Sequence, residues 1–195
     1  EGWDKIGVFY HDNVECSQMP KQFTDFVRAE ALVNREGYEF IKFLASYFNE
    51  FFDIYDLPQD STYHSFSVSR HTYHAYKYVL ENYPAKNDKD MEVMLWTALL
   101  HDTGKKFCKS FTNRKNEEVK YANFIGHEYV GSQIAINFLH KMNFDDEFIH
   151  KVSTMIQFHM YLLDEKASRD KLKNYVGEDI YEKLEFFRNA DTSAH

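Results

Sequence analysis

The stretch VMLWTALLHDTGK at residues 93–105 decides how the rest of this sequence is interpreted. Residues 93–100 are apolar except for Thr97, which predicts a buried helix that stops at Gly104. His101 and Asp102 follow that helix, and together they offer an imidazole nitrogen and a carboxylate oxygen to one cation. For the dipeptide alone, the simpler alternative is favoured: a helix terminus where His101 binds a carbonyl and Asp102 begins a turn.

Outside this stretch, composition and spacing predict an all-α fold, a compact helical bundle. Apolar residues make up 44% of the 195 residues, which excludes global disorder, and 7 Gly with 3 Pro are too few for a turn-dense all-β fold. Asp88 or Asp90 can cap the central helix. Helical spacing recurs at 22–52 with a break at 34–37, at 68–83, 88–100, 127–141, 145–163, 166–175 and 177–195, whereas 53–61 is a connection and 105–123 a loop or hairpin.

The same spacing suggests two parts to the chain. Residues 1–60 are interpreted as a mostly helical N-terminal extension without an assigned role, and residues 61–195 as the domain that carries the chemistry. The longest apolar run has eight residues, too short to cross a bilayer, so no membrane contact is predicted. Two cysteines, Cys16 and Cys108, form no disulfide framework, which favours a reduced, cytoplasmic setting.

The charge balance limits the partners. Lys and Arg number 23 against 31 Asp and Glu, a net charge of −8, which is evidence against a protein that coats long nucleic acid. A small phosphorylated substrate needs only a local basic patch. Residues 103–120 contain such a patch, with six basic residues against Glu117 and Glu118: Lys105, Lys106, Lys109, Arg114, Lys115 and Lys120. The alternative is a solvated loop.

The positions of the other histidines favour the interpretation of His101 and Asp102 as metal ligands over the helix-terminus alternative. His71 lies in the first turn of a predicted helix, His127 at the start of another, and His159 late in a long one. Asp191 belongs to the last helix. Antiparallel packing can bring such helix ends together, so each element contributes one candidate ligand.

The order His71, His101-Asp102, His127, His159, Asp191 resembles the H…HD…H…H…D signature of the HD-domain phosphohydrolase superfamily. LLHDTGK at 99–105 and GHEYVGS at 126–132 look most like the HD domain of bacterial CCA-adding enzymes and poly(A)-polymerase-like proteins. The resemblance covers about residues 62–195. A polymerase head is not expected, because the one Asp-x-Asp, at 88–90, has no Gly-Gly or Gly-Ser pair before it.

The resemblance implies an all-helical fold of the HD-domain type that binds a divalent metal. The implied ligands of the first ion are His71, His101, Asp102 and Asp191. In members with a second ion, His127 and His159 supply its ligands and Asp102 bridges the two. Such nitrogen and oxygen ligands suit Mn²⁺, Fe²⁺, Co²⁺, Ni²⁺ or Zn²⁺ better than Ca²⁺. One or two ions are therefore expected. Because Asp191 lies near the last residue, its helix must be tied down to keep the ligand in place.

Three further residues are interpreted as substrate-facing. Lys105 and Asp102 are the predicted catalytic residues, with the Lys105 ammonium neutralising charge on phosphoryl oxygens. Lys105, Lys106 and His64 are predicted to bind substrate. The alternatives are an exposed loop lysine at position 105 and a histidine outside the pocket at position 64.

Two functions remain open at this point. The first is a metal-dependent phosphohydrolase that cleaves a phosphomonoester or phosphodiester of a nucleotide or an RNA end. The second is a low-activity regulatory or binding HD module of a larger RNA-processing protein. The expected partners are a small phosphorylated substrate or an RNA end, and the sequence does not predict an oligomeric state.

Overall fold

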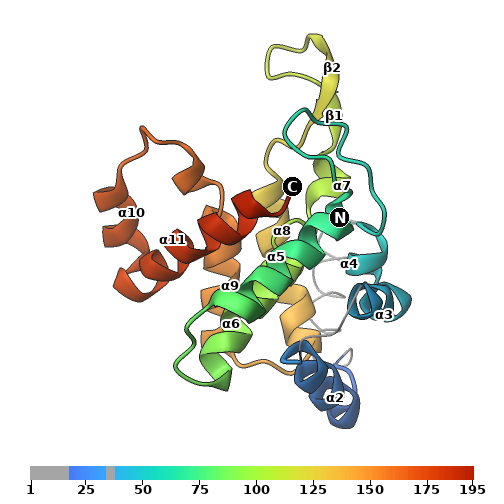
Figure 1. Ribbon diagram of the computed structural model, residues 1–195, viewed down its shortest axis with the longest axis vertical. Helices are drawn as coiled ribbons and strands as arrows, with labels where there is room; N and C mark the ends of the chain where they lie inside the picture. Colours follow the sequence, from blue (N-terminus) through green and yellow to red (C-terminus); the bar gives the residue numbers. More distant parts are fainter. Residues whose placement is uncertain (1–17, 34–37) are drawn as a thin grey trace, which may run out of the picture.

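The computed structural model describes residues 18–33 and 38–195, and it confirms the predicted all-α fold (Figure 1). The predicted break at 34–37 and Cys16 lie outside the described residues. The helices are α2 (Lys21–Ala31), α3 (Glu39–Tyr47), α4 (Asn49–Phe52), α5 (Val68–Asn82), α6 (Asp88–Leu100), α7 (Lys105–Cys108), α8 (His127–Lys141), α9 (Asp146–Phe158), α10 (Arg169–Val176) and α11 (Glu178–Ser193), with a 3₁₀ turn η1 (Tyr161–Leu163).

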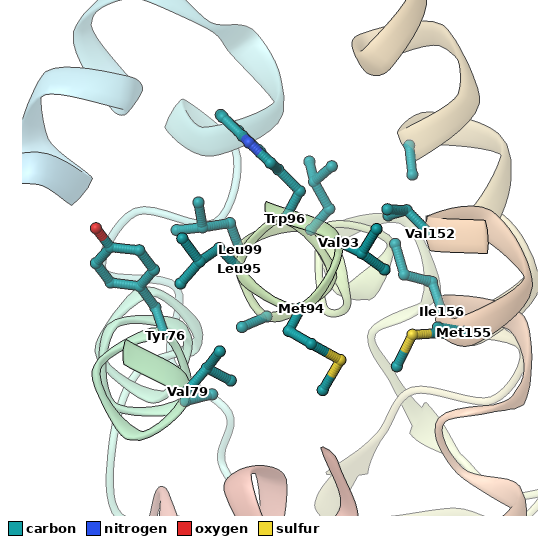
Figure 2. Packing of buried hydrophobic residues seen from close by; sticks show 14 of the residues in the cluster. Tyr76, Val79, Val93, Met94, Leu95, Trp96, Leu99, Val152, Met155 and Ile156 are labelled. Atoms are coloured by element: carbon teal, nitrogen blue, oxygen red, sulfur yellow. The ribbon is translucent and has the colours of Figure 1, made fainter. Parts of the chain in front are cut away.

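Helix α6 runs through the centre of the bundle. Residues 92–100 are all buried, so this helix is covered on every side by its neighbours. Figure 2 views it end-on: Leu95 lies toward Tyr76 of α5, and Val93 lies toward Val152 of α9. Since the helix is fixed between these elements, the residues that follow its C-terminal end are held in a rigid position.

Side-chain caps set where the site-bearing helices begin. The Asn87 side chain accepts the Asp90 N–H at 2.8 Å and caps α6, so the prediction that Asp88 or Asp90 is the cap was wrong. Ser67 caps α5 by accepting the Arg70 N–H, and Asp145 caps α9 in the same way. Asn is as good a cap as Asp, because either side chain presents an oxygen to the free N–H groups of the first turn.

The polar segment after α6 forms a hairpin, one of the two predicted forms, preceded by the short helix α7. Strand β1 (Ser110–Thr112) pairs antiparallel with β2 (Glu118–Asn123), and the register shifts between Ser110 and Thr112. The hairpin projects from the bundle near the C-terminal end of the chain (Figure 1). The segment predicted as one helix at 145–163 is α9 followed by η1, with the break at residues 159–160.

The N-terminal helices share the core of the remaining chain. The rings of Phe48 and Phe51 pack against Phe138 of α8, with centroids 5.0 and 5.5 Å apart. Glu50 forms a salt bridge with Lys141, in which Oε2 and Nζ are 2.7 Å apart. The division at residue 60 therefore stays a prediction. Among the described residues, no helix has both the length and the apolar character needed to cross a membrane.

Candidate metal centre

The ends of five long helices meet around one buried cluster. His71 comes from the first turns of α5, and His101 and Asp102 follow the end of α6. The remaining members are His127 at the start of α8, His159 at the end of α9, and Asp191 in the last turns of α11. The structure thus brings together all six residues predicted as metal ligands, and none is more than 9% exposed.

One half of the cluster surrounds the Oδ2 atom of Asp102. This atom lies 3.3 Å from Nε2 of His71 and 3.3 Å from Nε2 of His101. Nε2 of His71 is also 3.1 Å from Nε2 of His101 and 2.8 Å from Oδ1 of Asp191. Four ligand-type residues therefore converge on a single point.

The other half surrounds the second oxygen of the same carboxylate. Oδ1 of Asp102 lies 3.2 Å from Nε2 of His127 and 3.8 Å from Nε2 of His159. The two imidazole nitrogens are 3.3 Å apart. Asp102 thus directs one oxygen to each half, which is the arrangement of a carboxylate that bridges two positions.

Backbone carbonyls fix the orientation of all four imidazoles from behind. Nδ1 of His101 lies 2.7 Å from the carbonyl of Ala98, and Nδ1 of His71 contacts the carbonyl of Ala194. The other two rings make the same contact with residues three positions earlier: His127 with Phe124 at 2.9 Å and His159 with Ile156 at 2.6 Å. Because a carbonyl only accepts, each Nδ1 is the donor, and Nε2 is left to present its lone pair to the cluster.

This set of atoms fits a divalent cation. Imidazole Nε2 lone pairs and carboxylate oxygens face one another at hydrogen-bond distance with few hydrogens between them. The buried Oδ2 atom of Asp102 accepts no hydrogen bond, and Lys105 pairs with it only by charge, at 3.1 Å. Mixed nitrogen and oxygen donors of this kind are the ligands of transition metals, and the back-side carbonyl contacts are those that orient metal-binding histidines.

The titration behaviour agrees with a cluster built to hold positive charge. Burial opposes ionisation of Asp102, yet the charges of His101 and Lys105 hold its pKa well below the usual range. Burial lowers the pKa of His101, but Asp102 and Asp191 together raise it to about 10. Burial and the neighbouring His101 and His127 charges lower the pKa of His159 to about 3. The carboxylates therefore stay ionised, and their charge favours a positive charge held between them.

A close backbone contact sets the distance between the two halves. A Cβ added at Gly104 would lie 2.5 Å from the carbonyl oxygen of His127 and 2.7 Å from the backbone nitrogen of Gly131. Since both atoms belong to the backbone of α8, only glycine allows the turn after Asp102 to touch the start of that helix. The prediction that Gly104 terminates α6 was incomplete, because α6 ends at Leu100 and the glycine serves this approach.

Lys105 is buried beside the cluster, which excludes the alternative of an exposed loop lysine. It is 5% exposed, and its Nζ lies 2.7 Å from Oε1 of Gln59 and 3.1 Å from Oδ2 of Asp102. The ammonium also lies 5.0 Å from the centre of the Phe124 ring. Sequence reasoning missed Gln59, since nothing in the connection at 53–61 marks it as different from its neighbours.

A pocket of about 660 Å³ opens onto the cluster. Its lining includes Asp102, Lys105, His127, His159 and Asp191 from the residues discussed above. His64 also lines it, as predicted in one of the two alternatives, and burial together with Lys105 lowers the pKa of its ring to about 4. Lys106 lies elsewhere: it does not line the pocket, and its Nζ pairs with Asp53 at 2.8 Å.

The last residues are tied to the site, as the position of Asp191 requires. The Ala194 carbonyl contacts the ring of His71, and the His195 carbonyl accepts a hydrogen bond from Ser65 at 3.4 Å. Nδ1 of His195 also lies 3.2 Å from the Tyr63 carbonyl. These contacts hold the end of α11 against the start of α5.

Comparison with known proteins gives one match. A family model described as HD domain matches residues 62–192, which contain every residue of the cluster. Searches of curated proteins and of solved structures found no match.

Proposed function

This chain belongs to the HD domain family, and on that premise we propose that it is a metal-dependent phosphohydrolase. We infer that it cleaves a phosphomonoester or phosphodiester of a nucleotide or of an RNA end. Membership of the family supports metal-dependent hydrolysis in general. The residues that line the pocket, Lys105 above all, support a phosphate ester as the substrate. The observation that carries the proposal is the carboxylate of Asp102, whose two oxygens face two separate sets of ligand-type side chains beside an open pocket.

The residues that would hold the metal are the six of the cluster. His71, His101, Asp191 and Oδ2 of Asp102 form one set, and His127, His159 and Oδ1 of Asp102 form the other. We propose two ions, drawn from Mn²⁺, Fe²⁺, Co²⁺, Ni²⁺ or Zn²⁺. A bound divalent cation supplies a hydroxide nucleophile at neutral pH, because it lowers the pKa of its water.

The protein residues that act on the substrate line the pocket next to this cluster. Hydrolysis joins a water oxygen to phosphorus and breaks the ester P–O bond, and the departing ester oxygen takes up a proton that comes from the water. Lys105 has three N–H donors, of which one is directed to Gln59, and its charge pairs with Asp102. Its other donors can neutralise charge that develops on a phosphoryl oxygen. We propose that His64, which also lines the pocket, contacts the same phosphoryl group.

Three finer parts of the proposal rest on sequence alone. The likeness of LLHDTGK and GHEYVGS to the HD domain of CCA-adding enzymes and poly(A)-polymerase-like proteins favours an RNA end as substrate. The two separated cysteines favour a cytoplasmic setting. A regulatory HD module with little turnover is the alternative, and the experiment below separates it from the enzyme.

The test is hydrolysis by the purified chain after loading with each of the five metals. The substrates are nucleoside monophosphates, followed by phosphate release, and cyclic nucleotides and RNA oligomers with 2′,3′-cyclic phosphate ends, followed by chromatography of the ring-opened monoester. We expect metal-dependent hydrolysis that disappears in Asp102→Asn and persists in His150→Gln, a matched control because His150 is exposed and outside the cluster. Bound metal without turnover of any substrate would show that the regulatory module, and not the enzyme, is the correct proposal.

A further inference from the structure

One part of the pocket lining, here called the apolar wall, consists of large apolar side chains. It is built by Tyr63, Phe124, Ile125, Met160 and Leu163. Four of these side chains are substantially exposed: Tyr63 at 80%, Ile125 at 40%, Met160 at 38% and Leu163 at 38%. Large apolar side chains exposed together beside a cavity of this size mark a surface that receives an apolar part of a ligand.

Positive charge is scarce in the same pocket. Within residues 18–33 and 38–195, Lys105 is the only lysine or arginine that lines it. The next two lysines of the basic patch are already paired, Lys106 with Asp53 at 2.8 Å and Lys109 with Asp60 at 2.7 Å. The remaining basic residues of the patch lie on the hairpin and do not line the pocket: Arg114, Lys115 and Lys120.

These two observations limit how much phosphate a substrate can bring. Each additional phosphate group carries negative charge that must be matched by cations or left in water, and an apolar wall offers neither. Asp102 and Asp191 also line the pocket and repel any charge that the metal and Lys105 do not neutralise. A flat aromatic body, by contrast, can stack on Tyr63 or Phe124 and cover Ile125 and Leu163.

We infer that the substrate presents a single phosphoryl group to the metal centre and a planar, apolar body, such as a nucleobase, to this wall. Nucleoside diphosphates and triphosphates are then poor substrates. The inference rests on the proposed function and makes it narrower. It assigns specificity to Tyr63, Ile125, Met160 and Leu163, which take no part in the metal cluster.

Three compounds that all contain ribose 5-phosphate test the inference. The first is ribose 5-phosphate itself. Adenosine 5′-monophosphate adds the base, and adenosine 5′-triphosphate adds the base and two further phosphates. Both kcat/KM for phosphate release and the dissociation constant, by calorimetry on the metal-loaded chain at constant free metal, are measured for each. We expect the monophosphate to exceed ribose 5-phosphate by about tenfold or more in both quantities, the gain that stacking of one base provides. The triphosphate should fall at least about tenfold below the monophosphate.

Variants locate the effect on the wall. Tyr63→Ser and Leu163→Ser should each lower the ratio of monophosphate to ribose 5-phosphate by about threefold to tenfold. Tyr175→Ser is the matched control: Tyr175 is a tyrosine of α10 that is 76% exposed and does not line this pocket, so its loss leaves the ratio unchanged.

The outcomes separate the two proposals. Equal binding of monophosphate and ribose 5-phosphate, or a preference for the triphosphate, overturns the inference even if the enzyme is active. Absence of turnover with all three compounds argues against hydrolysis of 5′-phosphomonoesters, while the dissociation constants still decide whether the wall selects a base.

Discussion

Two polar clusters lie at opposite ends of helix α6, and both connect it to α11. At the start of α6, the partly buried Asp90 meets Lys183 of α11. At the other end, His101 contacts its neighbour Asp102 and Asp191 of α11, and all three side chains are buried. Both clusters use carboxylates and cationic or imidazole groups, yet they differ in burial and in whether their hydrogen-bonding groups are matched.

The cluster around Lys183 is complete by itself. Its Nζ lies 2.6 Å from Asp179 and 3.2 Å from Asp90. Asp90 also accepts the Tyr83 hydroxyl at 2.9 Å and the Lys86 N–H at 2.9 Å. Each carboxylate named here has a donor, and Lys183 and Tyr83 each have an acceptor, so this cluster needs no further ligand and joins two helices.

The cluster around Asp102, compared in the same way, has acceptors that lack donors. Its four imidazoles direct their Nδ1 protons to backbone carbonyls and their Nε2 lone pairs to one another and to two carboxylates. The comparison teaches that burial of charge alone does not identify a functional site. An excess of acceptors over donors, held rigidly, indicates one, because only a cation can satisfy it.

The largest expected effect follows from removing the shared acceptor. Asp102→Ala should lose most of the bound metal and reduce kcat/KM by about 10³-fold or more, since metal-based stabilisation of several kcal/mol is lost. Its counterpart Asp90→Ala should keep metal and turnover and lose stability instead. Elemental analysis and thermal unfolding of both variants check this. Wild-type metal content in Asp102→Ala would remove the basis for the metal centre.

Replacing either of the two buried lysines, Lys105 or Lys183, by alanine gives the next largest effect. Lys105→Ala should retain metal and reduce kcat/KM by about 10²–10³-fold, the loss seen when a charge-stabilising donor is removed. Lys183→Ala should leave kcat/KM unchanged and lower the free energy of unfolding by about 1.5–3 kcal/mol, because two charged hydrogen bonds are broken. Kinetics, metal content and urea unfolding are measured for both. Unchanged turnover in Lys105→Ala would show that the lysine only supports the turn.

The sequence, through the family resemblance, predicted the members of the metal cluster and the position of Asp102 between its two halves. His71, His101, Asp102 and His127 were identifiable because they recur at helix ends in the order of a known signature. The distances from the two Asp102 oxygens to each half were not predictable, since they depend on how α8 and α9 pack against α6. The back-side contact of His71 with Ala194 joins residues 123 positions apart, which no local pattern reports.

The role of the basic patch at residues 103–120 stays a prediction, and the structure shows what its composition could not. Lys106 and Lys109 pair with Asp53 and Asp60, which lie about fifty residues earlier in the chain. Pairing of surface charge is decided by tertiary structure. The spacing of buried helices, by contrast, is written into apolar periodicity, which is why α5, α6 and α8 begin and end close to their predicted limits.

Adding a methyl group at Gly104 tests whether the cluster around Asp102 depends on the close contact between the backbone at this residue and helix α8. Gly104→Ala places a Cβ 2.5 Å from the His127 carbonyl oxygen, so α8 must move away from Asp102. We expect a loss of about 1–3 kcal/mol in the free energy of unfolding, together with weaker binding of a second metal ion. Gly131→Ala is the matched control, because its nearest contacts are at 3.4 Å. Equal effects of the two substitutions on stability and metal stoichiometry would contradict this role of Gly104.

The smallest expected effect concerns the complete cluster and its dependence on pH. Burial and the hydrogen bond to Asp90 raise the pKa of Tyr83 from 10.0 to about 12. The folded chain therefore holds the phenol proton more tightly than the unfolded chain. This contribution to stability is fully present below pH 10 and is lost as the pH rises from 10 to about 12. Tyr83→Phe should lower the free energy of unfolding by about 1 kcal/mol at pH 7.

The same variant should also lose less stability than the wild type between pH 10 and 12, because it has no Tyr83 proton to release. Urea unfolding of the metal-free chain at pH 7, 10 and 11 measures both quantities without precipitation of metal hydroxide. Tyr175→Phe, at a tyrosine that is 76% exposed, is the control for the general titration of tyrosines. Parallel pH profiles for wild type and Tyr83→Phe would mean that the hydroxyl is not part of the matched cluster. Metal content at pH 7 should be the same in all three proteins, because Tyr83 contacts the end of α6 that carries no ligand.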